Sequence, residues 1–276
     1  MKNYLLPSLL LLVVLFVACS KDDDPAPPVN QKKVTYIVMV ALDDGIAYLP
    51  DGGYDGLNPV LVEYPEVSTE LDQVVAVVNF NDKYRNENGI KGTEYYHYKN
   101  GKRITLESTP TIQKIGEDSQ YVTKIIDLAV TNAPADEYML IFNSHGGGWD
   151  DTDAEDPISR STLAVNDTTK KMGKSLSLNR LLKGYKNSML AQQGKKLKAI
   201  YYDNCLMHTI ENLSEIADIA EYSLGTPNVS ISATQANTYL INSIRNSTEF
   251  ETSLTQAAAY INSTCAKDGQ YGCSGL

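Results

Sequence analysis

The chain has 276 residues, a formal net charge of -10 at pH 7 and 42% hydrophobic residues. This length allows one large α/β domain or two small ones, with a substantial buried core. Nucleic acid is not expected as a partner, because phosphate binding needs clustered Lys and Arg and the chain has no basic stripe.

The N-terminus has the features of a bacterial lipoprotein signal. Residues 5–18 are apolar, a length that suits a signal-peptide core and is too short to span a bilayer comfortably. The stretch FVAC at 16–19 resembles a lipobox, so we predict a signal peptide over 1–18 and a lipid on Cys19 that anchors the chain to the membrane. Residues 19–32 read as a flexible tether rich in acid and proline. Its acidic start resembles the signal for the outer face of an outer membrane, which predicts a surface-exposed lipoprotein.

Four nearly continuous apolar runs, rich in β-branched residues, predict strands that are covered on both faces. They span 34–41, 74–80, 138–143 and 197–202. Such runs are typical of a parallel sheet. Between the second and third runs, shorter and more polar strands at 95–98 and 102–106 are joined by Asn100-Gly101, which favours a hairpin turn.

Helical periodicity is found between the strands and after them. A helix is predicted from about residue 118 to residue 130, with Pro134 just beyond its end. Others are predicted at 178–190, at 249–263 and directly after Cys205, where apolar residues as far as Ala220 follow helical spacing. Alternating strands and helices with right-handed crossovers predict a single α/β domain over 33–276, a three-layer αβα sandwich with a mostly parallel sheet.

Two of the predicted strands end in residues that can carry chemistry. His145 and a run of glycines follow the strand at 138–143, and Cys205 follows the strand at 197–202. Functional groups in open parallel sheets gather beyond the carboxyl ends of the strands. If the two strands are neighbours, an imidazole and a thiol leave the same edge side by side, which predicts a Cys-His dyad.

The glycines after His145 have a chemical use besides forming a turn. Amide N–H groups in a glycine-rich segment are not shielded by Cβ atoms, so those of Gly146 and Cys205 could donate to a developing oxyanion. A phosphate-binding loop is not expected, because no Lys followed by Ser or Thr completes that motif. An esterase is not expected either, because the sequence has no Gly-x-Ser-x-Gly elbow.

The two motifs together resemble those of a known family. The stretches NSHGGGW at 143–149 and YDNCLM at 202–207 are similar to the His and Cys motifs of the clostripain family of cysteine peptidases, and the resemblance runs from about residue 34 to residue 220. It implies a caspase-like fold and hydrolysis of peptide bonds after Arg or Lys.

The resemblance also implies a role for each site residue. Cys205 would be the nucleophile, His145 its partner, and Gly146 part of the oxyanion hole. Asp203, two residues before the nucleophile, would lie in the pocket for the basic side chain. A partly desolvated carboxylate in that place selects a cation strongly.

Members of the family are often cut by their own activity between the two motifs. The intervening loop, at 150–177, is long and polar, and long loops in compact domains are commonly functional. An ordinary surface insertion is the alternative. The basic candidates for processing are Arg160, Lys170, Lys171 and Lys174.

The other histidines are weaker candidates for the dyad. His208 would share a helical face with Cys205 if the helix began there, but it would point back along the helix. His97 is expected to be a hairpin side chain. No His/Cys cluster has metal-binding spacing, so no metal site is predicted. Calcium is a candidate cofactor through the family resemblance, with acidic residues at 150–156 as ligands, although such runs are more often solvated loops.

The other three cysteines have predicted roles in lipidation or pairing, which leaves Cys205 available for another role. Cys19 would carry lipid, and Cys265 and Cys273 are close enough in sequence to pair. A small buried hydrophobe is the alternative interpretation of Cys205. The chain ends at Leu276, earlier than is typical of the family, which predicts that part of the substrate cleft is absent.

Two functions from different classes follow from these observations. The first is an anchored, monomeric cysteine endopeptidase that acts on peptides or proteins with Arg or Lys. The second is a non-catalytic surface lipoprotein of the same fold that binds peptide or another partner. The combination of Cys205, His145, Gly146 and Asp203 favours the first, because a binding module does not need all four.

Overall fold

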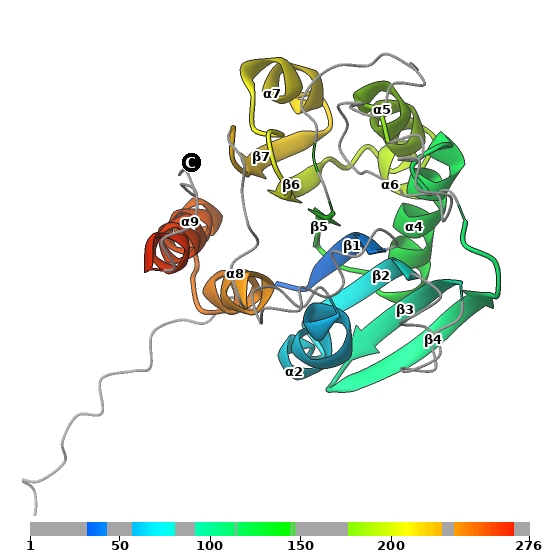
Figure 1. Cartoon of the computed structure of the whole chain (residues 1–276), viewed down its shortest axis with the longest axis horizontal. Helices are drawn as coiled ribbons and strands as arrows, with labels where there is room; N and C mark the ends of the chain where they lie inside the picture. The colour runs from blue at the N-terminus through cyan, green and yellow to red at the C-terminus, as the bar shows by residue number, and fades with distance from the viewer. Residues whose placement is uncertain are drawn as a thin grey trace, which may run out of the picture.

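The computed structural model describes residues 32–42, 57–80, 92–113, 115–144, 146, 176–227 and 235–267. In these ranges seven strands form one sheet with helices on both faces (Figure 1). The strands are β1 (Val34–Leu42), β2 (Asp72–Phe80), β3 (Thr93–Lys99), β4 (Lys102–Thr109), β5 (Glu137–Asn143), β6 (Leu197–Asp203) and β7 (Ala220–Leu224). The helices are η1 (Pro59–Glu63, a π-helix), α2 (Tyr64–Val67), α4 (Ser119–Asn132), α5 (Leu178–Lys186), α6 (Met189–Gln192), α7 (Ile210–Ile216), α8 (Ala236–Arg245) and α9 (Phe250–Lys267).

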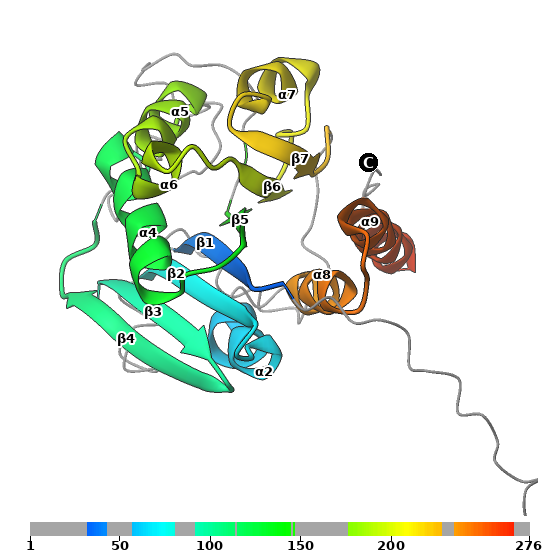
Figure 2. The same ribbon diagram turned by 180° about the vertical axis from the view of Figure 1, so that it is seen from behind.

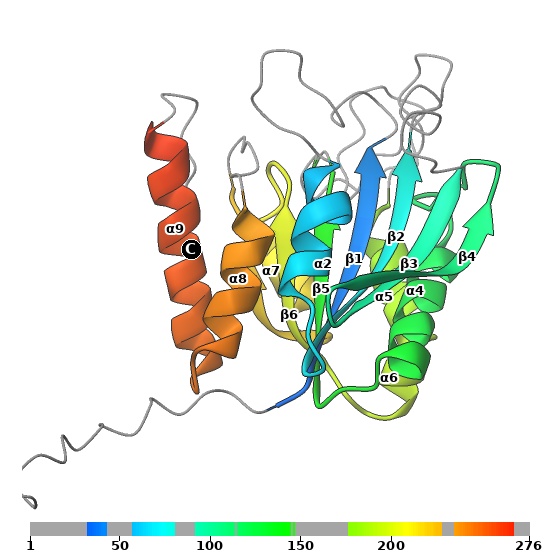
Figure 3. The same ribbon diagram turned by 90° about the horizontal axis from the view of Figure 1, so that it is seen from below.

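The sheet is mostly parallel. Its strand order is β4-β3-β2-β1-β5-β6-β7, and only the hairpin strands β3 and β4 run antiparallel to their neighbours. The carboxyl ends of the parallel strands therefore lie along one edge of the sheet (Figure 3). The predicted α/β class with a mostly parallel sheet is confirmed.

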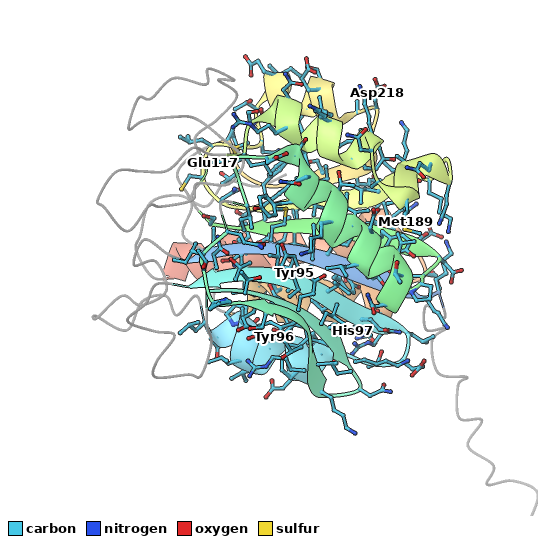
Figure 4. The ribbon with its side chains drawn as sticks, turned by 90° about the vertical axis from the view of Figure 1, so that its right-hand side faces the viewer. Tyr95, Tyr96, His97, Glu117, Met189 and Asp218 are labelled. Carbon is cyan, nitrogen blue, oxygen red and sulfur yellow. The ribbon has the colours of Figure 1, made fainter. Side chains whose placement is uncertain are left out.

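Two helical layers bury the two faces of the sheet, as views from opposite sides show (Figures 1 and 2). Helices α4 to α7 cover one face, and η1, α2, α8 and α9 cover the other. Successive strand residues alternate between the two cores, so that Tyr95 of β3 packs on the α4 side and Tyr96 on the α2 side (Figure 4). Burial on both faces explains why the central strands are continuous apolar runs.

The predicted hairpin between β3 and β4 is confirmed. Asn100 and Gly101 both have positive φ, 51° and 74°, as a two-residue turn of type I′ requires. Asparagine and glycine adopt this left-handed conformation more readily than other residues, so the turn follows directly from the sequence.

Two helix predictions are wrong in part. The helix expected at 178–190 is divided, because α5 ends at Lys186 and the Ser188 hydroxyl accepts a hydrogen bond from Ala191 N–H at the start of α6. The helix expected directly after Cys205 begins only at Ile210. Ala220, expected at its end, instead starts β7 and pairs with Leu197 of β6. Elements η1, α2, β7 and α8 have no counterpart among the predicted ones.

Two polar side chains attach α8 to the rest of the domain. Buried Glu63, in η1, accepts hydrogen bonds from Asn58 Nδ2 at 2.8 Å and from Thr238 Oγ1, in the first turn of α8, at 3.0 Å. At the other end of α8, Arg245 Nε donates to Asp72 Oδ2 at 2.7 Å. The first end of α8 is thus joined to η1 in the same helical layer, and the last end is joined to β2 of the sheet.

Candidate active site

The two strands that precede the candidate dyad are neighbours in the sheet. Strands β5 and β6 are parallel, and their last residues, Asn143 and Asp203, are register partners. The chain therefore leaves both strands at the same edge, as predicted from the sequence. Ser144, the first residue after β5, is also fastened to β1, because its hydroxyl donates to the Ala41 carbonyl at 3.1 Å.

The backbone after the histidine packs directly on the cysteine. A Cβ atom built on Gly146 would lie 2.0 Å from the Cys205 carbonyl oxygen and 2.9 Å from Cγ of Met207. Only a residue without a side chain fits at this distance. His145 itself lies outside the described residues, but both of its sequence neighbours, Ser144 and Gly146, are placed at this edge.

Cys205 lies on a turn at the end of β6. It is partly exposed. The next residue, Leu206, has φ of 61°, a left-handed conformation that is strained for a side chain of this size. This turn carries the chain from β6 towards α7, so Cys205 occupies a sharp bend and not a helix.

Asp203 is buried beside two neutral hydrogen-bond donors. Asn143 Nδ2 donates to Oδ2 of Asp203 at 2.9 Å, and the Tyr201 hydroxyl donates to Oδ1 at 3.3 Å. Only 7% of Asp203 is exposed. Asn143 and Tyr201 were not predicted as site residues. For Asn143 the signal was the parallel register, which places the residue two before His145 opposite the residue two before Cys205. For Tyr201 the signal was the alternation of side chains along β6, which puts residues 201 and 203 on the same face of the strand.

His208 does not share a helical face with Cys205, because no helix has begun at this point. Its backbone N–H donates to the Thr226 carbonyl at 3.1 Å, and its ring packs near Gly225, at the exit of β7. Burial lowers the pKa of His208, partly offset by a hydrogen bond to the backbone of Ser223. His208 thus contacts the β7 side of β6, whereas His145 follows β5 on the opposite side.

His97 lies in β3, which three strands separate from β6. Its Nε2 atom is 2.7 Å from Gln73 Oε1, and its side chain is buried. Burial, and secondarily the charge of Lys99, lowers the pKa of His97. The prediction that His97 is a hairpin side chain is confirmed.

Several predicted features lie outside the described residues. They are Cys19, the 150–177 loop up to residue 175 with Arg160, Lys170, Lys171 and Lys174, the acidic residues at 150–156, the side chain of Cys265, and Cys273. Within the described ranges, no group of three or more His, Cys, Asp or Glu side chains could hold a metal ion. The helices in those same ranges include none that is long and apolar enough to cross a bilayer.

Comparison with known proteins gives this arrangement a family context. The profile of the Clostripain family matches residues 61–268, which include both motifs. No curated protein matches the chain.

Three solved structures share the fold. A secreted C11 cysteine protease from Bacteroides thetaiotaomicron, bound to an irreversible peptide inhibitor, has a TM-score of 0.62 at 16% identity, over 86% of this chain and 59% of that one. An inactive zymogen C11 protease from Parabacteroides distasonis has a TM-score of 0.61 at 15% identity, over 87% and 61% of the two chains. A secreted C11 cysteine protease from B. thetaiotaomicron called iotapain has a TM-score of 0.58 at 14% identity, over 85% of this chain and 62% of that one. The chain thus spans about three fifths of the length of these structures.

Proposed function

Because the chain belongs to the clostripain family of cysteine peptidases, we propose that it is a cysteine endopeptidase that hydrolyses peptide bonds after Arg or Lys. The observation that carries this proposal is the contact of the bare Gly146 backbone with the Cys205 carbonyl. It brings the histidine motif and the cysteine motif together at one edge of the sheet. A dyad needs its two members at such an edge, since the imidazole must reach the thiol.

The proposed reaction proceeds in two steps. The Cys205 thiol gives its proton to the His145 imidazole, and the sulfur attacks the carbonyl carbon of the scissile bond. The imidazolium then protonates the leaving amine as the C–N bond breaks, which leaves an acyl group on the sulfur. Water, deprotonated by the imidazole, hydrolyses this thioester and restores the thiol. Backbone N–H groups of Gly146 and Cys205 would stabilise the oxyanion in both steps.

Asp203 is proposed to select the basic side chain. It ends the strand that carries the nucleophile, and its carboxylate is held by the uncharged donors Asn143 and Tyr201. Donors without charge orient a carboxylate without cancelling its attraction for a cation. A peptide with Arg or Lys before the cleaved bond would therefore bind in preference to a neutral one.

Peptide cleavage by purified protein tests this proposal. The chain without its first 18 residues, with Cys205→Ala and His145→Ala variants, is incubated with peptides bearing Arg, Lys, Leu or Asp before a reporter group. Cleavage after Arg and Lys should be lost in both variants. A folded wild-type chain that releases no reporter, with or without calcium, would refute the peptidase and favour a binding protein of the same fold.

The same samples test self-processing. We propose cleavage after Arg160, Lys170, Lys171 or Lys174, because these basic residues lie between the two motifs. Mass spectrometry should find a cut after one of them in the wild-type chain and an intact Cys205→Ala chain. A cut in both chains would assign the cleavage to another protease.

Anchoring through Cys19 is proposed from the lipobox-like stretch that precedes it. Expressed in a bacterium that has an outer membrane, the full chain should incorporate labelled palmitate and be digested by protease added to whole cells. Cys19→Ser should take up no label. Labelled protein that resists digestion in intact cells would contradict surface display.

A further inference from the structure

The last residues of β5 and β6 are joined by a buried polar bridge. Asn143 and Asp203 face each other in register, and the Asn143 amide donates to one carboxylate oxygen while the Tyr201 hydroxyl donates to the other. We propose that Asn143 and Tyr201 are positioning residues, which fix the Asp203 carboxylate in the orientation that selects a cationic substrate side chain. This inference rests on the proposed function of Asp203.

The bridge is built from residues with little freedom to move. Asn143, Tyr201 and Asp203 are 2%, 3% and 7% exposed, and all three belong to strands within the sheet. A carboxylate held through one oxygen can still rotate about its Cβ–Cγ bond. Donors on both oxygens, from two different side chains, oppose that rotation.

The place of the bridge in the sequence links it to the dyad. Asn143 stands two residues before His145, and Asp203 stands two residues before Cys205. One hydrogen bond therefore joins the two strand ends from which the candidate catalytic residues leave. A purely structural role for this bond would affect every substrate alike, whereas a role in orienting Asp203 would affect charged substrates most.

Paired substrates separate these two roles. Citrulline has nearly the shape of arginine but lacks its positive charge, so the ratio of kcat/KM for an Arg peptide to that for the matching citrulline peptide measures charge selection. In Asn143→Ala this ratio should fall at least about tenfold, mainly through a higher KM for the Arg peptide, because a hydrogen bond to a charged group is lost. Tyr201→Phe, which keeps the ring, should lower the ratio by a smaller factor because its hydrogen bond is longer.

Asn79→Ala is the matched control. Asn79 is also a buried asparagine near the end of a strand of this sheet, where its amide donates to the Gln113 carbonyl at 2.7 Å and its oxygen accepts from Thr93. Its removal should lower Tm as Asn143→Ala does and leave the Arg-to-citrulline ratio unchanged. A folded Asn143→Ala protein that loses activity equally on both peptides would overturn the inference.

A binding measurement keeps this test apart from that of the peptidase itself. In the Cys205→Ala background, calorimetry with the Arg and citrulline peptides reports on the pocket and not on the chemistry. Weaker binding of the Arg peptide alone when Asn143→Ala is added supports the positioning role, even if the wild-type chain cleaves nothing. Equal affinity for the two peptides before that substitution would overturn the role assigned to Asp203 and the inference that depends on it.

Discussion

A single methyl group at Gly146 would be enough to disturb the candidate active site. The Cβ atom of alanine there would lie 2.0 Å from the Cys205 carbonyl oxygen, so backbone must move. We expect Gly146→Ala to lower kcat/KM by about 100-fold, as displacements of about 1 Å at a catalytic site can do. Overpacking should also cost about 1–3 kcal/mol of unfolding free energy. Peptide cleavage and urea unfolding measure the two effects.

Gly101→Ala controls for the general effect of replacing a glycine. Gly101 has φ of 74° in the β3–β4 turn, and no atom lies within 4 Å of a Cβ built there. The left-handed conformation should cost about 1–2 kcal/mol of stability, with no change in kcat/KM because the hairpin is remote from Cys205. Comparable losses of activity in the two variants would show that the contact at Gly146 has no special importance.

At the scale of whole elements, Glu63 connects η1 to α8. Burial raises the pKa of its carboxyl group, against the lowering effect of hydrogen bonds from Thr238 and Asn58. The folded chain therefore binds this proton more tightly than the unfolded chain does. Its contribution to stability is complete below the unfolded pKa of about 4.5 and is lost as the pH rises through the raised folded value.

Glu63→Gln should therefore change the pH dependence of folding. The unfolding free energy of the wild-type chain minus that of the variant should decrease as the pH rises from 4.5 towards 7, because only the wild type must expel a buried proton. Urea unfolding at several pH values gives this difference. Glu66→Gln, an exposed position on α2, is the control. A difference that is flat with pH for Glu63→Gln would contradict the burial argument.

The elements that sequence alone predicts are those in which one physical signal dominates. Strands β1, β2, β5 and β6 are covered on both faces, so their apolar runs are unbroken. Strand β7 was missed because it lies at the edge of the sheet and only Ala220 and Leu224 of its five residues are buried. Those two, four residues apart and continuing the spacing of α7, also fit a helix.

In the candidate site, too, some features could be predicted from the sequence and others could not. Cys205 and Gly146 could be named from sequence because their motifs follow predicted strands, whereas the role of Asp203 came from the resemblance to the clostripain family. The bond from Asn143 to Asp203 could not, since it depends on which strands are neighbours and in which register. Tyr201 lies two residues before Asp203 in the same strand, so strand alternation puts both side chains on one face but does not fix the hydrogen bond between them. Register is a tertiary property that a single sequence fixes only indirectly.

At the scale of the whole molecule, two of the three histidines make the stability of the fold depend on pH. Burial lowers the pKa of both His97 and His208 below the ordinary value of 6.5. The unfolded chain therefore binds more protons than the folded chain in mildly acidic solution. The stability that these histidines contribute is complete above about pH 6.5 and is lost as the pH falls through their folded values.

The unfolding free energy of the wild-type chain minus that of His97→Gln should therefore decrease as the pH falls from 7.5 to 5.5, because glutamine cannot be charged and its amide can still donate to Gln73. The opposite pH dependence of Glu63 is common to both chains and cancels in this difference. Calorimetry of the wild-type chain and the variant at several pH values measures the two free energies. A difference that stays constant would exclude His97 as a source of the acid sensitivity.

The position of β1 in the sheet also has a consequence for how the protein is made. Among the described strands this one comes earliest in the sequence, and it lies at the centre of the sheet, where Val34 pairs with Asp72 on one side and with Glu137 on the other. About 100 more residues must be synthesised before β5 can pair with the second edge of β1, and such distant pairings slow folding. Until then an apolar strand has one edge open to other nascent chains. The half of the sheet that carries the candidate active site, β5 to β7, is therefore completed late in folding.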